Sequence, residues 1–158
     1  MRKRFTSYKD YSTATMQDIF PNGELQQSKR LQVSETNSVC YLRTGNKFIK
    51  QLLPAEAQFS MITKIICDDF DHDGYKDLVL MGNHSDNRLK IGSIDANYGC
   101  LLKGDGRGGF SYLPQSVSGL NVAGDVKAAE LMKIMGQSYL MIGAADHSLQ
   151  VYKTRQDK

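Results

Sequence analysis

The chain repeats parts of itself at an interval of about 60 residues, and this repeat limits the folds open to it. The matched pieces are Cys40-Tyr41-Leu42 with Cys100-Leu101-Leu102, Leu53-Pro54 with Leu113-Pro114, Gly74 with Gly136, and Leu78 with Leu140. The chain has 158 residues, of which 41% are apolar and 23% charged, enough for one ordinary globular core. A fold made of similar units in series is therefore expected.

The repeats consist of short apolar runs broken by Gly, Asn and Asp, which is typical of β-strands. The expected strands cover residues 38–43, 47–52, 61–67, 78–82, 98–103, 110–113, 126–132, 139–143 and 150–153. Thr44-Gly45-Asn46 indicates a hairpin turn. Residues 104–109 are glycine-rich, but the Lys-Ser/Thr pair of a phosphate-binding loop is absent, which favours a turn there as well. A period near 60 made of four short strands is typical of a β-propeller blade. We therefore expect a mainly β fold, a partial β-propeller of about two to two and a half four-stranded antiparallel blades.

A short helical segment is expected before the strands. Apolar residues between Ser7 and Phe20 recur at mixed three- and four-residue spacings, and Thr15-Met16-Gln17-Asp18 has the form of a capping box. Residues 24–31 are compatible with one or two further helical turns. We interpret residues 1–31 as a helical packing arm.

Four aspartates occupy alternate or near-alternate positions between two expected strands. Asp69, Asp71, Asp73 and Asp77 stand at positions 1, 3, 5 and 9 of this loop. Alternation points these side chains inward and directs Phe70, His72 and Lys76 elsewhere. Four carboxylates this close repel one another strongly unless a cation lies between them.

The rest of the loop suits calcium. Gly74 permits a sharp bend, and the Tyr75 carbonyl falls at position 7, where a backbone oxygen is wanted. Calcium takes about six to eight oxygen ligands, whereas magnesium prefers a tighter octahedron with retained waters and is the second choice. The predicted metal ligands are Asp69, Asp71, Asp73, Tyr75 and Asp77. An acidic turn without metal is the alternative.

An EF-hand does not fit this loop. Position 12 is Leu80 instead of Glu, and apolar, strand-like runs flank the loop where helices should stand. The second copy of the loop, residues 131–139, keeps only its glycine, Gly136, and is predicted to bind no ion. We expect the first site to be structural, pinning a hairpin.

The sequence also resembles a known family. The stretch 69–78 is similar to the calcium loop of FG-GAP/VCBS repeats, the blade unit of integrin-α-like propellers. The segments 8–20, 53–60, 98–110 and 149–152 look like the carboxy-terminal part of ASPIC/UnbV-associated VCBS-repeat proteins of Bacteroidetes type. The resemblance covers the chain from Tyr8 to Lys153, and it is most specific in the loop and in the Ala55–Ser60 segment.

The resemblance implies a larger protein than this chain. Such proteins are usually several times longer, are exported and form seven-bladed propellers, whereas this chain lacks a signal sequence and most of the blades. It therefore implies an extracytoplasmic location (periplasmic, surface or secreted) as part of a longer precursor. From the residues alone, a chain that stays inside the cell is equally open, because residues 5–10 form no apolar signal region.

The predicted parts are a helical arm over 1–31, the end of a first blade over 32–54, a complete calcium-loop blade over 55–114, and a degenerate metal-free blade with its tail over 115–158. The predicted function is that of a non-enzymatic, calcium-binding repeat module of a surface protein for cell adhesion or for protein or glycan binding. One alternative is a purely structural propeller fragment with calcium as its only ligand. Another is a fragment of a metal-dependent hydrolase, although calcium is poor at activating water.

Several other classes are disfavoured. The net charge is +3 with scattered basic residues, so no nucleic-acid partner is expected. No run approaches the roughly 18 apolar residues of a membrane helix, so no membrane insertion is expected. Cys40, Cys67 and Cys100 have no CxxC spacing and lie in or beside apolar runs, which predicts buried free thiols. No Ser-His-Asp arrangement emerges around His72, His84 or His147.

Partners are expected at two kinds of surface. The polar loops 83–88 and 95–98 are where we expect a protein or glycan to bind. An incomplete propeller also leaves open sheet edges and uncovered apolar faces, which ordinarily pair with something. We therefore expect the isolated chain to self-associate or to cover a blade face with its amino-terminal helices.

Overall fold

The computed structural model describes residues 5–20 and 23–154 of the chain. Parts of the predicted arm, at 1–4 and 21–22, and of the predicted tail, at 155–158, lie outside the described residues. The chain divides into two compact units, Met1–Thr36 and Asn37–Lys158. Among the described residues, no helix is long and apolar enough to cross a membrane.

Over the residues described in the first unit, the chain forms three short helices, α1 (Tyr8–Ser12), α2 (Met16–Ile19) and α3 (Glu24–Gln27). The predicted capping box is confirmed at α2. The Asp18 backbone N–H donates to Thr15 Oγ1 at 3.3 Å, and the Thr15 N–H donates to Asp18 Oδ2 at 2.8 Å. These two bonds satisfy donors at the start of the helix that have no partner within it. Helix α3 ends at Gln27, since Ser28 is already extended, so only residues 24–27 of the predicted stretch 24–31 form a helical turn.

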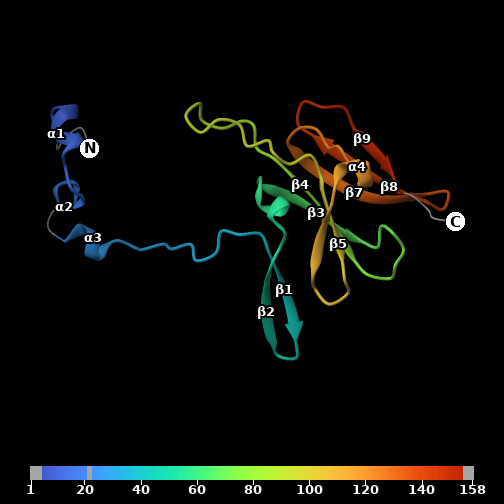
Figure 1. Ribbon diagram of the computed structural model, residues 1–158. Helices are drawn as coiled ribbons and strands as arrows, with labels where there is room; N and C mark the ends of the chain where they lie inside the picture. The colour runs from blue at the N-terminus through green and yellow to red at the C-terminus, as the bar shows by residue number, and fades with distance from the viewer. Residues whose placement is uncertain (1–4, 21–22, 155–158) are drawn as a thin grey trace. The chain divides into compact units, whose positions relative to one another are not determined.

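The second unit is built of β-strands in three antiparallel sheets (Figure 1). The first sheet pairs β1 (Val39–Thr44) with β2 (Lys47–Leu52); the second has the order β3 (Ile62–Asp68), β4 (Asp77–Gly82), β5 (Cys100–Gly104), β6 (Phe110–Leu113); the third has the order β7 (Val126–Ile134), β8 (Gln137–Ala144), β9 (Gln150–Lys153). All nine lie within a few residues of the predicted ranges. A 3-10 turn, η1 (Ala55–Gln58), and a short helix, α4 (Gln115–Ser118), were not predicted.

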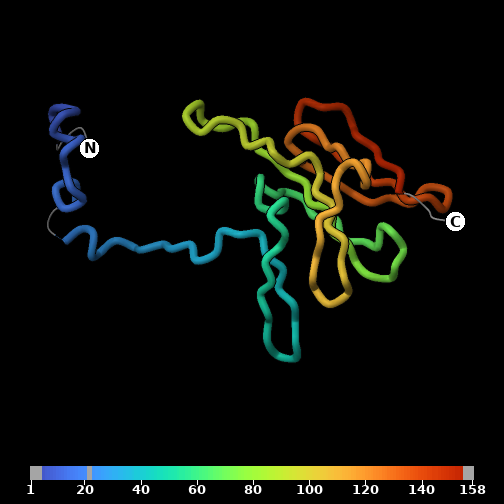
Figure 2. The backbone as a smooth tube through the Cα atoms, viewed as in Figure 1, coloured from blue at the N-terminus to red at the C-terminus, as the bar shows by residue number. Residues whose placement is uncertain are grey.

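Neighbours within each sheet are also neighbours in sequence, so every sheet is a meander. The β1–β2 connection is the predicted tight turn, with Thr44 paired to Lys47 and Gly45 at φ +60°. The β4–β5 connection is much longer and extends away from the sheet as the yellow-green loop in Figure 2. The mainly β class is confirmed. The described strands do not close into a barrel or a propeller, so the assignment of the sheets as blades stays a prediction.

The four-stranded sheet has apolar residues buried on both faces. Val79 and Met81 of β4 pack with Val126, Leu140 and Ile142 of the third sheet. On the opposite face, a second cluster unites Leu53, Ala57, Leu80, Cys100 and Leu102. Strands β3 and β7 lie beside each other, and Thr63 Oγ1 donates to the Val126 carbonyl at 2.7 Å. The middle sheet is thus held between the third sheet and the β2–η1 region.

The cysteine prediction is only partly right. The three cysteines are free, and Cys100 is buried, which raises the pKa of its thiol to about 11. Cys40 is half-buried. The prediction is wrong for Cys67, which is exposed, because it lies on β3, an edge strand of the middle sheet whose side chains alternate in and out of the core.

Candidate metal centre

The aspartate loop connects β3 to β4 and is the bright green loop of Figure 1. Its two ends are joined in the ladder, where Asp68 pairs with Asp77. Gly74 adopts φ +90°, a conformation that favours glycine, and nothing lies near the place a Cβ would take. The conformation itself, rather than crowding, is therefore what calls for glycine at the bend.

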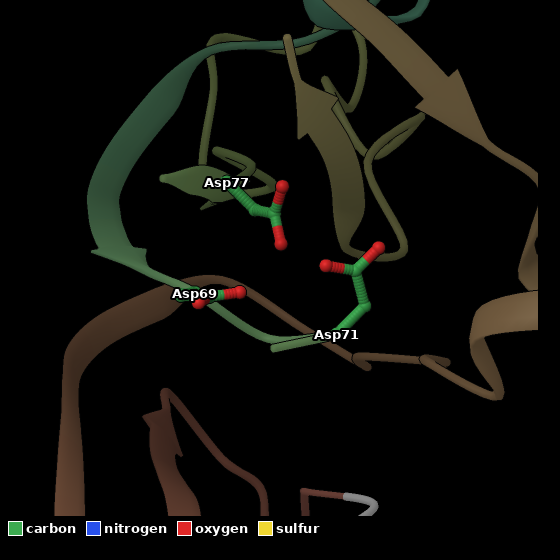
Figure 3. Close-up of side chains that lie close together, drawn as sticks. All are labelled: Asp69, Asp71 and Asp77. Carbon is green, nitrogen blue, oxygen red and sulfur yellow. The ribbon is translucent and has the colours of Figure 1, made fainter. Parts of the chain in front are cut away.

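Three of the predicted ligands converge. The carboxylates of Asp69, Asp71 and Asp77 each offer an oxygen, and these oxygens lie within 4.8 Å of one another. Figure 3 shows the three carboxylates pointing toward a common space, with Asp71 facing Asp77 across the loop. The three side chains differ in exposure, from buried Asp77 through half-buried Asp69 to exposed Asp71. A small hard cation could reach this space from the Asp71 side.

Asp77 is the buried member and ties the loop to a distant strand. Its side chain is 2% exposed. Oδ2 accepts the Phe70 backbone N–H at 3.0 Å, and Oδ1 accepts the Gly104 N–H at 2.9 Å. A Cβ at Gly104 would collide with the Lys76 carbonyl, so glycine is needed for this approach. Asp77 thereby fixes the acidic loop against the β5–β6 turn.

The other carboxylates bind backbone donors of the loop itself. Asp69 accepts the N–H groups of Asp73 and Gly74 at 3.1 and 3.0 Å. Asp71 Oδ1 lies 3.3 Å from the Asp73 nitrogen, and Asp73 Oδ1 accepts the Tyr75 N–H at 2.8 Å. The backbone of the loop therefore folds around its own carboxylates and donates hydrogen bonds to them. A carboxylate has about four lone-pair positions, so these bonds leave capacity for an ion.

Asp73 is not a member of the converging cluster. Its Oδ2 lies 3.0 Å from Nζ of Lys103, a residue of β5 that also contacts Asp71 Oδ2. The Tyr75 N–H and then the Lys103 ammonium lower the pKa of Asp73, while Asp71 and then Asp73 raise the pKa of Lys103. Both groups are charged at neutral pH.

Sequence reasoning missed Lys103, although strand register could have found it. Leu78 pairs with Leu102 in the antiparallel β4–β5 ladder. The residue before Leu78 and the residue after Leu102 then face each other across the same pair of strands, which places Lys103 beside Asp77. If the strand register of the predicted blade had been known, it would have placed Lys103 beside the loop.

Phe70 and Lys76, which were predicted to point away from the centre of the loop, contact other groups. Phe70 packs against the core cluster between the middle and third sheets. Lys76 Nζ lies 2.8 Å from Asp68 Oδ1, and this pairing lowers the pKa of Asp68 and raises that of Lys76. His72 is exposed and has φ +62°. The metal-ligand role of the Tyr75 carbonyl stays a prediction.

The two predicted binding loops meet each other. His84 and Ile94 form an isolated antiparallel bridge. Asn83 Nδ2 donates to the Asn97 carbonyl at 2.7 Å, and the Asn97 N–H donates to Asn83 Oδ1 at 2.9 Å. Both asparagines are buried. Their polar groups therefore hold the base of the β4–β5 connection together, and only the outer residues of these loops are open to a partner.

Comparison of the chain with protein-family models, with curated proteins and with solved structures found no match. The resemblance to FG-GAP/VCBS repeats therefore stays a prediction.

Proposed function

We propose that this chain is a non-enzymatic calcium-binding module in which the ion holds the β3–β4 loop in place. The observation that carries the proposal is the convergence of Asp69, Asp71 and Asp77, whose oxygens lie within 4.8 Å of one another. Without a cation, these carboxylates repel one another. A divalent ion relieves this repulsion and adds bonds that exist only in the folded loop.

The donor set favours calcium. Every side chain of the cluster offers carboxylate oxygen, and hard oxygen ligands suit calcium, magnesium and manganese better than zinc or copper. The donors come from a loop of mixed exposure instead of a rigid octahedral cage, which favours the adaptable calcium shell. Asp69, Asp71 and Asp77 would hold the ion through their carboxylates, with Asp73 and the Tyr75 carbonyl as the further predicted ligands.

The proposed role of the ion is structural. Asp77 already bonds to Phe70 in the loop and to Gly104 in β5, so an ion bound to Asp77 would stiffen both segments. This supports a site that stabilises the middle sheet and the turn that follows β5. We propose no catalytic step for it, because calcium lowers the pKa of bound water only weakly compared with zinc.

Thermal unfolding of the chain with calcium and with chelator tests the proposal. A ligand that binds only the folded state stabilises it by about 2.7 kcal/mol at a hundredfold excess over its Kd. We expect a higher midpoint in calcium, and we expect the double change Asp71→Ala, Asp73→Ala to abolish the difference. Asp68→Ala is the matched control, because Asp68 pairs with Lys76 outside the cluster. An unchanged midpoint at millimolar calcium would contradict the proposal.

We also propose a wider setting for the chain, an FG-GAP/VCBS-type propeller of an exported protein. The FG-GAP/VCBS-type propeller is supported by three sheets of two, four and three strands that follow one another along the chain. Export and the binding of a protein or glycan through the outer residues of the loops 83–88 and 95–98 rest on the sequence alone. A glycan array tests the binding, since hits that survive substitutions in these loops would contradict it.

Self-association is the remaining proposal about partners. The register places Met132 of β7, Tyr139 of β8 and Lys153 of β9 in one row, with Glu130, Met141 and Val151 in the next. These residues lie on the face of the third sheet opposite Leu140 and Ile142, which are buried in the core. Met132 and Val151 are 45% and 52% exposed, so this face offers apolar surface to another molecule.

A further inference from the structure

We propose that Lys103 is a built-in cation of the acidic loop, which holds Asp71 and Asp73 in the ion-free protein and competes with calcium for them. This inference rests on the proposed calcium site and concerns how that site is regulated. Loading the loop with calcium would then require the ammonium group to leave at least one of its two carboxylates.

The position of Lys103 is set by the fold. It stands next to Gly104, whose N–H donates to Asp77 Oδ1 at 2.9 Å, so the backbone at this point of β5 is fixed beside the loop. From there, Nζ contacts Asp71 Oδ2 and lies 3.0 Å from Asp73 Oδ2. Two of the five predicted ligands are therefore engaged by one ammonium group that arrives from another strand.

The ammonium group of Lys103 and a calcium ion are attracted to the same two carboxylates, those of Asp71 and Asp73. An ammonium ion donates hydrogen bonds to carboxylate oxygens, whereas calcium coordinates them directly, and the Asp71 carboxylate binds each cation less strongly when it holds both. Asp73 is turned toward Lys103 and lies outside the converging cluster, so it can join the ion only after this pairing loosens. The neighbouring carboxylates also raise the pKa of Lys103, so its charge persists at neutral pH.

The competition has two consequences. In the absence of calcium, Lys103 neutralises part of the negative charge of the loop. The repulsion between the carboxylates is then smaller, so the loop keeps its conformation. In the presence of calcium, a positive charge beside the ion weakens binding. For partly exposed charges a few ångströms apart, this repulsion amounts to about tenfold in affinity at physiological salt.

Lys76 provides a matched control. It is a lysine of the same loop region, and its Nζ lies 2.8 Å from a carboxylate, but that carboxylate belongs to Asp68, outside the cluster. Removing its charge therefore removes an ion pair of the same kind without freeing a predicted ligand. Lys103→Arg is a second control, because it keeps the charge at the position under test.

Calcium titration calorimetry and thermal unfolding in chelator, both on the full chain, test the proposal. We expect Lys103→Met to bind calcium about tenfold more tightly than the unchanged chain and to unfold at a lower temperature in chelator. We expect Lys76→Met to change calcium affinity by less than about twofold, and Lys103→Arg, which keeps the charge with a different donor geometry, to lie closer to the unchanged chain than to Lys103→Met in both properties.

The outcomes separate this inference from the proposed function. Calcium binding by the unchanged chain with equal or weaker binding by Lys103→Met would overturn the role of Lys103 and leave the calcium site intact. If no variant binds calcium, the calcium site is wrong. The competition with calcium is then wrong as well, and the unfolding midpoints in chelator test only whether Lys103 holds the ion-free loop. Equal midpoints for Lys103→Met and Lys76→Met would contradict that role, whereas a selective loss in Lys103→Met would support it.

Discussion

The aspartates of the loop differ in the hydrogen bonds and ion pairs that they make within the protein. Asp77 is buried and accepts two backbone N–H groups, from Phe70 and from Gly104. Asp71 is exposed, and its partners are the Asp73 nitrogen and the Lys103 ammonium. The same predicted ligand set therefore contains a residue whose buried hydrogen bonds join two parts of the fold and a residue that makes only exposed contacts.

This difference predicts distinct effects of substitution in chelator. Asp77→Ala leaves two N–H groups in a buried region without their acceptor, and we expect it to lower the free energy of unfolding by about 2 kcal/mol or more. Asp71→Ala removes only exposed contacts, and we expect a smaller loss. Urea unfolding of both variants measures the difference. Equal losses would show that Asp77 has no special structural part.

The spacing of the aspartates was visible in the sequence because the loop is local. Nine consecutive residues contain all the predicted ligands, and three of their carboxylates do converge. Lys103 could not be found in the same way, because it is about 30 residues away in the chain and reaches the loop only through the β4–β5 register. Asp73 pairs with that lysine and lies outside the cluster, which could not be foreseen for the same reason.

At the scale of elements, the strands were predictable and the short turns were not. Alternating and apolar runs marked all nine strands, since burial on one or both faces selects such patterns. The turns η1 and α4 each have four residues and follow a proline, Pro54 or Pro114, which is too short a stretch to show helical periodicity. Strands β7 and β8 extend beyond their predicted ends because a two-residue turn, Met135-Gly136, joins them.

That turn contains a strained residue. Met135 and Gly136 have φ +51° and +82°, the pattern of a type I′ hairpin, which favours Asn or Gly at both positions. Met135 is fully exposed, so its side chain gains nothing from packing. We expect Met135→Asn to raise the free energy of unfolding by about 0.5 kcal/mol or more.

Gly136→Ala is the matched substitution at the next position. Nothing lies within 4 Å of the place where its Cβ would stand, so any loss reports backbone strain alone. We expect a loss of about 1 kcal/mol. Thermal or urea unfolding measures both changes, and a loss of stability in Met135→Asn would contradict the assigned turn.

At the scale of the whole molecule, the half-exposed apolar side chains on the outer face of the third sheet predict association. Met132, Ile134 and Val151 are each about half exposed on its strands. Burying such a face is favourable, so we expect the mass of the chain in light scattering to rise with concentration. Met132→Lys should shift the chain toward the monomer, whereas Met135→Lys at the adjacent turn should not. A monomer at all concentrations would contradict the prediction.

The position of strand β4 between the two core clusters has a consequence for unfolding. Strand β4 sends Val79 and Met81 into one core cluster and Leu80 into the other. The same strand thus contributes side chains to both clusters. Any local unfolding that displaces β4 from one cluster also removes packing contacts from the other. We therefore expect the middle sheet, the third sheet and the η1 region to unfold as one cooperative unit, in which neither cluster melts while its neighbour stays intact.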